Sequence, residues 1–211
     1  GQNEDARVAE AIAAHYRPAG AGDAVPNEPI AIAVALADKL QTIAAFFAIG
    51  EKPTGSGDPF ALRRAALGVI RIIRENGLRL PLRDATTTAL IEWADILRLG
   101  LDEIKQTTDD VLAFFAERLR VQMRVEGQRY DIVEAAFAAR GETGATFGKR
   151  EAGVSDDDLN RLLSRADAVR GFVESEAGAN LLAAHRRAVN ILRIEEKRDG
   201  HAFDTGYEAH L

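Results

Sequence analysis

The stretch Ile30-Ala-Ile-Ala-Val-Ala-Leu-Ala-Asp38-Lys39-Leu-Gln41-Thr42-Ile-Ala-Ala-Phe-Phe-Ala-Ile49 predicts the centre of the fold. Drawn as a helix, it is apolar on nearly every side. A helix that is hydrophobic all round is buried, so we expect the other elements to surround this one. Asn27 is placed to cap it, Pro29 suits its first turn, and Gly50 suits its end. Its polar residues collect in one arc: Asp38, Lys39, Gln41 and Thr42.

A loop rich in proline and glycine follows at 50–59, and a second helical pattern follows the loop. Asp58 is a favourable capping residue, and Pro59 fits the first turn of a helix because a missing N–H costs nothing there. We therefore predict a helix that begins at Asp58-Pro59 and runs to Asn76-Gly77.

The rest of the sequence is also helical in pattern. Alanine, leucine and arginine dominate, and no segment alternates polar and apolar residues, which predicts an all-α fold. We expect further helices at 5–16, from Asp84 or Thr86 to 99, from a cap at Thr107 or Thr108 to 126, and at 131–140, 155–169 and 179–198. The Gly/Thr-rich segment 141–153 is expected to form a mobile loop, and the tail 201–211 is expected to fray.

Composition narrows the functional class. The 211 residues carry 27 basic and 33 acidic side chains, a net charge of -6, so the field of the whole chain would not attract DNA or an anionic membrane. No apolar run approaches the roughly 20 residues of a membrane span, and the chain contains no cysteine. Residues 1–5 have neither the basic start nor the apolar run of a signal peptide, so no export is expected. These features favour a cytoplasmic protein. The only methionine is Met123, and we interpret the sequence as part of a longer chain.

One basic segment stands out in this acidic protein. Between Phe60 and Arg83 there are six arginines and a single acid, Glu75. At about 100° per residue, four of the arginines share one helix face, opposite an apolar face. Guanidinium groups pair well with phosphate oxygens, so this face is a candidate contact for a nucleic-acid backbone, although a solvated outer face remains open. The four arginines are Arg63, Arg64, Arg71 and Arg74.

The sequence shows no self-contained catalytic site and no metal site. The glycine-rich segment 50–56 lacks the lysine of a phosphate-binding P-loop and follows a helix instead of a strand. No nucleophile elbow or dinucleotide fingerprint is present. The histidines are scattered without the i, i+4 spacing of a metal pair, and they are His15, His185, His201 and His210.

Asp38 is the residue that the sequence most favours as part of a metal or phosphate site. A carboxylate in so apolar a helix is expected to be buried, and burial of a charge is costly unless the charge is paired or bound to metal. Two interpretations are open from the residues alone. Asp38 forms a structural ion pair or hydrogen bond with a neighbouring helix, or it belongs to the remnant of a metal or phosphate site.

A family resemblance covers nearly the whole chain. The segments Ala37-Asp38-Lys39-Leu40-x-Thr42 and Phe47-x-Ile49-Gly50-x-x-Pro53-Thr54-Gly55-Ser56-x-Asp58-Pro59-Phe60-Ala61-Leu62-Arg63-Arg64-Ala65-Ala66-Leu67-Gly68 closely resemble the β subunit of bacterial tetrameric glycyl-tRNA synthetases. Weaker likeness continues through Asp109-Asp110-Val111, Tyr130-Asp131 and the helix from Asn180 to Leu192. The resemblance implies the late part of a helical HD-like domain at 1–108, then a helical linker and the start of an anticodon-binding region at 109–211.

The Ala37-Asp38-Lys39 motif also looks like the last aspartate of the HD-superfamily metal phosphohydrolases. In those enzymes the aspartate holds a metal together with upstream histidines and an aspartate. Gln41 replaces an aspartate that is common in the synthetase β subunits, which weakens the case for a working metal site here. We therefore expect Asp38 to be a remnant of the HD motif.

The resemblance implies a role in attaching glycine to tRNA(Gly), with ATP and magnesium as cofactors of the whole enzyme and none in this segment. It assigns the chemistry to a partner α subunit, while the β subunit binds tRNA and scaffolds an α2β2 tetramer. The arginine face would then contact tRNA. Two alternatives remain open at this point: a fragment of an HD-type phosphohydrolase, and a purely structural helical module.

Overall fold

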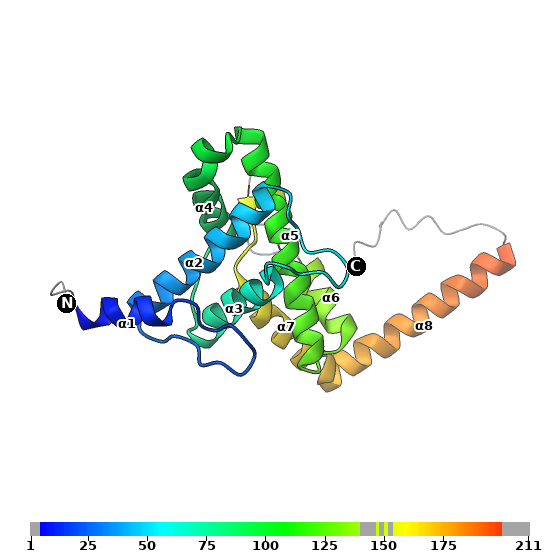
Figure 1. Ribbon diagram of the computed structural model, residues 1–211. Helices are drawn as coiled ribbons and strands as arrows, with labels where there is room; N and C mark the ends of the chain where they lie inside the picture. The colour runs from blue at the N-terminus through cyan, green and yellow to red at the C-terminus, as the bar shows by residue number, and fades with distance from the viewer. Residues whose placement is uncertain (1–4, 140–146, 148–149, 152–153, 200–211) are drawn as a thin grey trace.

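The computed structural model describes residues 5–139, 147, 150–151 and 154–199. In these residues the chain forms eight helices and one small hairpin (Figure 1). The helices are α1 (Ala6–Ala14), α2 (Pro29–Ala48), α3 (Leu62–Glu75), α4 (Leu82–Leu97), α5 (Leu101–Val125), α6 (Tyr130–Ala138), α7 (Leu159–Glu174) and α8 (Glu176–Asp199). In the hairpin, β1 (Arg150–Glu151) pairs with β2 (Val154–Ser155) antiparallel. The all-α prediction is confirmed, whereas the tail 201–211 and most of the predicted loop 141–153 lie outside the described residues.

Helix α2 is central, as the sequence predicts. It packs against α1, α3, α4 and α5 (Figure 1). Ala35, Ile43 and Ala44 are completely buried in these contacts. Of the described helices, α2 alone has the length and hydropathy that could cross a membrane. Its contacts with four helices supply the apolar surroundings that such a composition requires in a folded core.

The hydrophobic core lies beside α2, where α3, α5, α6 and α7 meet. Phe115 of α5 is the largest fully buried side chain. On the same helix, the ring of Phe114 packs against Phe47 of α2 with 5.2 Å between centroids. A second, smaller cluster joins α2, α4 and α5 through Ala44, Ala89, Leu90 and Ile104.

The capping residue of α2 and the first residue of α3 differ from the sequence prediction. Glu28, not Asn27, caps α2, and its Oε2 accepts the N–H groups of Ile30 at 2.8 Å and Ala31 at 3.1 Å. Helix α3 begins at Leu62 instead of Pro59, since Ala61 is left-handed with φ 56°. Asp58 still supplies the cap: its carboxylate accepts the N–H groups of Leu62 at 2.8 Å and of Arg63 at 3.1 Å.

The helix predicted to follow a cap at Thr107 or Thr108 starts earlier. Helix α5 begins at Leu101, where the Glu103 carboxylate accepts the Gly100 N–H at 2.7 Å. Thr108 lies inside the helix, buried, and its hydroxyl donates to the Ile104 carbonyl at 2.8 Å. The predicted division between 108 and 109 falls within this continuous helix and stays a prediction.

The run Asp156-Asp157-Asp158 fastens α7 to the rest of the molecule. The predicted start at Ser155 is wrong, because Asp158 caps α7 and Ser155 belongs to β2. The Asp156 carboxylate pairs with Arg165 at 2.7 Å. Asp157 accepts the backbone N–H of Arg83 and so caps α4 across the tertiary interface. Asp157 therefore ties this segment to α4, while Asp158 caps α7 and Asp156 pairs with an arginine of α7.

Asp157→Asn is expected to gain stability relative to the native chain as pH rises. Burial raises the pKa of the Asp157 carboxyl above its ordinary value of 3.8, although the Arg83 N–H opposes this shift. Between 3.8 and the raised pKa, the folded chain holds a proton that the unfolded chain has lost, so native stability falls as pH rises. Asparagine keeps an acceptor oxygen for the Arg83 N–H but cannot ionise. Urea unfolding of both proteins at several pH values measures the difference, and a difference constant from acidic to neutral pH would contradict the expectation.

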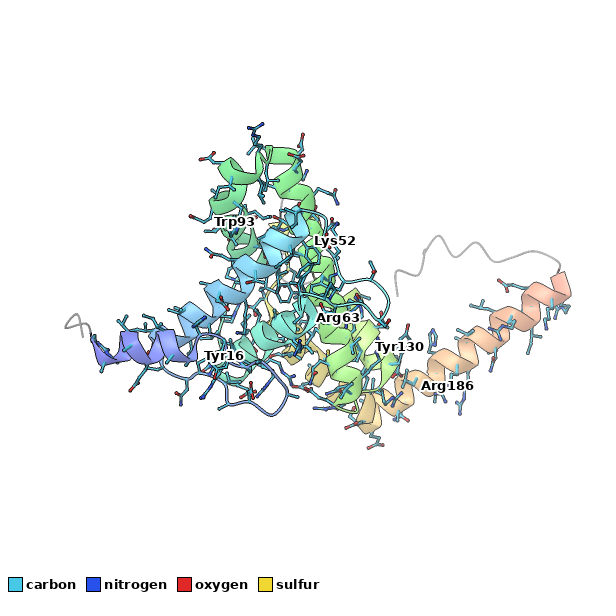
Figure 2. All side chains as sticks on the ribbon, in the orientation of Figure 1. Tyr16, Lys52, Arg63, Trp93, Tyr130 and Arg186 are labelled. Carbon is cyan, nitrogen blue, oxygen red and sulfur yellow. The ribbon has the colours of Figure 1, made fainter. Side chains whose placement is uncertain are left out.

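Helix α8 projects away from the body of the molecule (Figure 1). Its packing is against α7, and its side chains, Arg186 among them, stand clear of the other helices (Figure 2). Apolar residues on it are nevertheless exposed, as in Ile194, which is 62% exposed. Because isolated helices are marginal in water, α8 lacks most of the tertiary support that stabilises the other helices.

Candidate functional site

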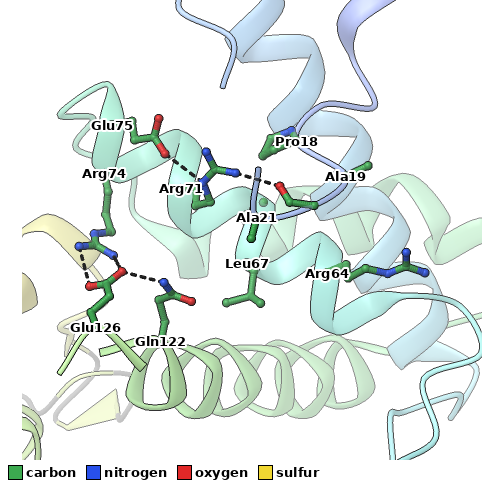
Figure 3. Close-up of a pocket in the computed structure, with 12 residues that line it drawn as sticks. Pro18, Ala19, Ala21, Arg64, Leu67, Arg71, Arg74, Glu75, Gln122 and Glu126 are labelled. Atoms are coloured by element: carbon green, nitrogen blue, oxygen red, sulfur yellow. Dashed lines mark hydrogen bonds and ion pairs between the residues drawn. The ribbon is translucent and has the colours of Figure 1, made fainter. Parts of the chain in front are cut away.

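Three arginines line a pocket on α3. The pocket has a volume of about 410 Å³, with α3 as its floor and α5 and the loop 18–21 as its walls (Figure 3). We call it the arginine pocket. Its lining residues are Pro18, Ala19, Gly20, Ala21, Arg64, Leu67, Gly68, Arg71, Arg74, Glu75, Gln122 and Glu126.

Three of the four predicted arginines line this pocket, and Arg63 does not. The Arg63 guanidinium turns to the loop before α3, where it donates to the carbonyls of Gly57 at 3.0 Å and Gly55 at 2.8 Å. The helical angle placed Arg63 on the shared face, but these carbonyl acceptors draw its side chain aside. Arg63 therefore stabilises the loop 55–57 in this structure.

Arg71 joins α3 to the loop between α1 and α2. Its Nη1 donates to the Gly20 carbonyl at 3.0 Å, and its Nη2 donates to the Asp23 carbonyl at 2.9 Å. Its Nε also pairs with Glu75, one turn along the helix, at 2.9 Å. Most donors of this guanidinium are thus already engaged, and Arg71 mainly positions the wall of the pocket while adding positive charge.

Arg74 forms a forked ion pair with Glu126 at the end of α5. The two nitrogen–oxygen distances are 2.7 and 3.1 Å, and Gln122 also donates to Glu126 at 2.7 Å (Figure 3). Hydrogen bonding from Arg74 holds the pKa of the Glu126 carboxyl below its ordinary value, against a smaller effect of burial. Arg74 therefore ties α3 to α5, with its charge largely balanced by Glu126.

Arg64 is the arginine that remains available. It is exposed, and within the described residues its guanidinium has no hydrogen-bond or ion-pair partner. It stands at one end of the pocket, clear of the Arg71 and Arg74 networks (Figure 3). An exposed, unpartnered guanidinium is suited to bind a phosphate oxygen.

Lys39 is the charged residue of the polar arc that is buried. The sequence alone did not single it out as a functional residue. Only 5% of it is exposed, and its Nζ donates to the backbone carbonyls of His15 at 3.2 Å and Tyr16 at 3.0 Å. Burial lowers the pKa of the Lys39 ammonium, while the neighbouring Asp38 charge opposes this shift. The signal in the sequence was the lysine inside an apolar helix, since a long stem can reach past the core to a polar end.

Asp38 is exposed, so the expectation that it is buried and must be paired is wrong. It lies at a groove of about 390 Å³ between α2 and α4 that also contains Gln41, Thr42 and Trp93. Among the described residues, no group of three or more His, Cys, Asp or Glu side chains is placed to hold a metal. The interpretation of Asp38 as a remnant of the HD motif stays a prediction.

The histidines do not meet in the described part of the chain. His15 lies at the end of α1, where its Nδ1 is 2.6 Å from the Ile12 carbonyl oxygen. His185 is exposed on α8. His201 and His210 lie outside the described residues.

Comparison with known proteins connects this arrangement to one family. Residues 1–138 match the family described as glycyl-tRNA synthetase beta subunit. The chain is 52% identical over 208 residues to a glycine–tRNA ligase beta subunit of Rhodospirillum centenum, covering 97% of this chain and 26% of that protein. Beta subunits with the same name from Phenylobacterium zucineum and Cereibacter sphaeroides are 48% and 43% identical over 92% and 94% of the chain. The chain spans about a quarter of the length of these relatives, 24% of the second and 26% of the third.

Proposed function

We propose, since the chain belongs to the glycyl-tRNA synthetase beta subunit family, that it contributes tRNA binding and scaffolding to the ATP-dependent attachment of glycine to tRNA. The relatives are named as ligase beta subunits, which supports a tRNA substrate and a partner α subunit. We assign the chemical steps, with their ATP and magnesium, to that partner. Within the part of the chain that the structure describes, no three His, Cys, Asp or Glu side chains are grouped to hold a metal.

The observation that carries the RNA part of the proposal is the free guanidinium of Arg64 at the rim of the arginine pocket. A contact with a phosphate group requires an accessible positive charge or hydrogen-bond donor, and it does not depend on the identity of the base. Arg71 and Arg74 lie further along the same helix face, and they add charge even though their own hydrogen bonds are largely satisfied.

The acidic character of the chain does not oppose such a contact. The net charge is -6, but interactions between exposed charges are largely screened beyond about 8 Å at physiological salt. The potential at the pocket is therefore set by nearby groups. Those groups are three arginines against Glu75 and Glu126, a local excess of positive charge.

Arg64→Gln in the assembled enzyme tests this proposal. The variant is expected to bind tRNA(Gly) about fivefold more weakly, because one charge-assisted contact is lost. The slope of log K against log salt should become shallower by about 0.7 to 0.9, the contribution of one phosphate contact. Fluorescence anisotropy with labelled tRNA over a range of salt concentrations measures both quantities.

Lys105→Gln is the matched control for this charge loss. Lys105 is an exposed cation in the first half of α5 and does not line the arginine pocket. Its replacement should leave the affinity and the slope close to those of the native enzyme. An Arg64→Gln enzyme that matches the Lys105→Gln enzyme in both quantities would overturn the proposed contact.

A further inference from the structure

A buried lysine of α2 contacts the chain just before the loop 18–21, which forms one wall of the arginine pocket. Lys39 extends from α2 between α1 and α3, and its Nζ donates to the carbonyls of His15 and Tyr16. These carbonyls belong to the end of α1, where helical carbonyls have no partner within the helix and attract a cation. The chain turns directly afterwards into Pro18–Ala21, the segment that lines the pocket.

Gly68 of α3 creates the space through which the Lys39 side chain passes. A Cβ atom at Gly68 would lie 2.8 Å from Lys39 Cε, 3.2 Å from its Cδ and 3.1 Å from the Pro18 carbonyl oxygen. Only glycine at this position lets the lysine stem and the Pro18 turn lie on α3 together. The floor of the pocket and its wall therefore meet at the Lys39 stem.

Two other groups hold the same loop further along. Arg71 binds the carbonyls of Gly20 and Asp23. The Asp23 carboxylate accepts the N–H groups of Ala19 at 2.7 Å and Gly20 at 3.2 Å, which closes the turn on itself. Three residues thus hold the loop: Lys39, Arg71 and Asp23. Asp23 belongs to the loop and Arg71 lines the pocket, whereas Lys39 does neither.

We infer that Lys39 is a positioning residue for the arginine pocket: it holds the 18–21 wall against α3 so that a bound phosphate group meets Arg64 in a preformed site. This inference rests on the proposed function, since it assigns the pocket an RNA phosphate as its ligand. It also changes the meaning of the Ala37-Asp38-Lys39 motif. The structural requirement for the motif lies in the lysine that reaches α1, whereas Asp38 faces outward.

Lys39→Met in the assembled enzyme tests the inference, because methionine keeps an apolar stem and removes the Nζ donor. Without the donor, the hydrogen bonds to the His15 and Tyr16 carbonyls are both lost. Hydrogen exchange in peptides that cover residues 15–23 should become at least about fivefold faster, the equivalent of a single hydrogen bond. Affinity for tRNA(Gly) should fall, and the roughly fivefold penalty of Arg64→Gln should shrink to about twofold or less in the Lys39→Met background.

Leu90→Ala provides the control for a general loss of stability. Leu90 is fully buried in the smaller cluster of α2, α4 and α5 and does not line the pocket. Its replacement should leave exchange in 15–23 and the Arg64→Gln penalty unchanged. If Lys39 only stabilised the fold, the Arg64→Gln penalty would be the same with and without Lys39→Met. A smaller penalty in the Lys39→Met background therefore indicates a positioning role.

Three results would overturn the inference, and they are distinguishable. Unchanged exchange in 15–23 would show that Lys39 does not hold the loop. Faster exchange with an undiminished Arg64→Gln penalty would show that the loop does not shape the pocket. Faster exchange together with no effect of Arg64→Gln in the native background would contradict the proposed function, and the inference would fall with it.

Discussion

Phe115→Ala is expected to lower the free energy of unfolding by about 3–5 kcal/mol, the range for removing a fully buried aromatic ring. Phe115 is completely buried on α5, in the cluster that joins α2, α3, α6 and α7. A cavity at this point cannot be filled by solvent or by collapse of a single loop, since helices surround it on several sides. Urea denaturation followed by circular dichroism measures the loss.

Phe172→Ala is the matched control for the Phe115 variant. Phe172 is 48% exposed near the end of α7, so its ring has less apolar contact to lose. Its replacement should cost well below the Phe115 value. Equal losses for the two variants would contradict the placement of the core at α5.

Gly68→Ala is expected to destabilise the protein although alanine is the better helix former. In an open helix the substitution gains about 1 kcal/mol. Here the new methyl group would displace Lys39 and press on the Pro18 carbonyl, and overpacking of this kind costs about 1–3 kcal/mol. A net loss of up to about 2 kcal/mol in urea denaturation is therefore expected.

Gly171→Ala separates this steric effect from helix propensity. Gly171 lies within α7 and is exposed, and a methyl group added there would meet no other atom within 4 Å. Its replacement should therefore stabilise the chain by up to about 1 kcal/mol. In a Lys39→Ala background, most of the clash at Gly68 is absent, and the Gly68→Ala penalty should shrink. A stabilising Gly68→Ala substitution in the native background would contradict the packing of Lys39 on α3.

Periodicity predicted the architecture well because apolar burial dominates it. The apolar stretch 30–49 is the central helix, and every helix expected from the pattern is present in the described residues. Helix starts were less predictable where the cap comes from a distance. Asp58 was identified as a cap, but it acts four residues ahead of the start of α3. Asp157 caps α4 from another part of the chain, and no local pattern contains that contact.

The candidate site was predictable in composition and less so in detail. The basic face of α3 exists, and Arg64, Arg71 and Arg74 line one pocket. Their partners could not be predicted, since the carbonyls of Gly20 and Asp23 and the carboxylate of Glu126 are distant in sequence. These partners are the reason that the four arginines are not equivalent.

The polar arc of α2 shows a limit of single-helix reasoning. Asp38 and Lys39 are adjacent, about 100° apart on the helix, and that angle decides which of them is buried. The pattern alone favoured burial of the carboxylate. The structure exposes Asp38 and buries Lys39, because the end of α1 offers carbonyl acceptors and Gly68 leaves room for a long stem.

The contact between tRNA and the arginine pocket is tested most directly by photocrosslinking. tRNA(Gly) containing 4-thiouridine is irradiated in complex with the assembled enzyme, and the crosslinked peptides are mapped by mass spectrometry. The proposed function predicts crosslinks in peptides that cover 18–21 or 60–75, and a reduced yield there in the Arg64→Gln enzyme. Crosslinks confined to peptides outside these two segments would contradict it.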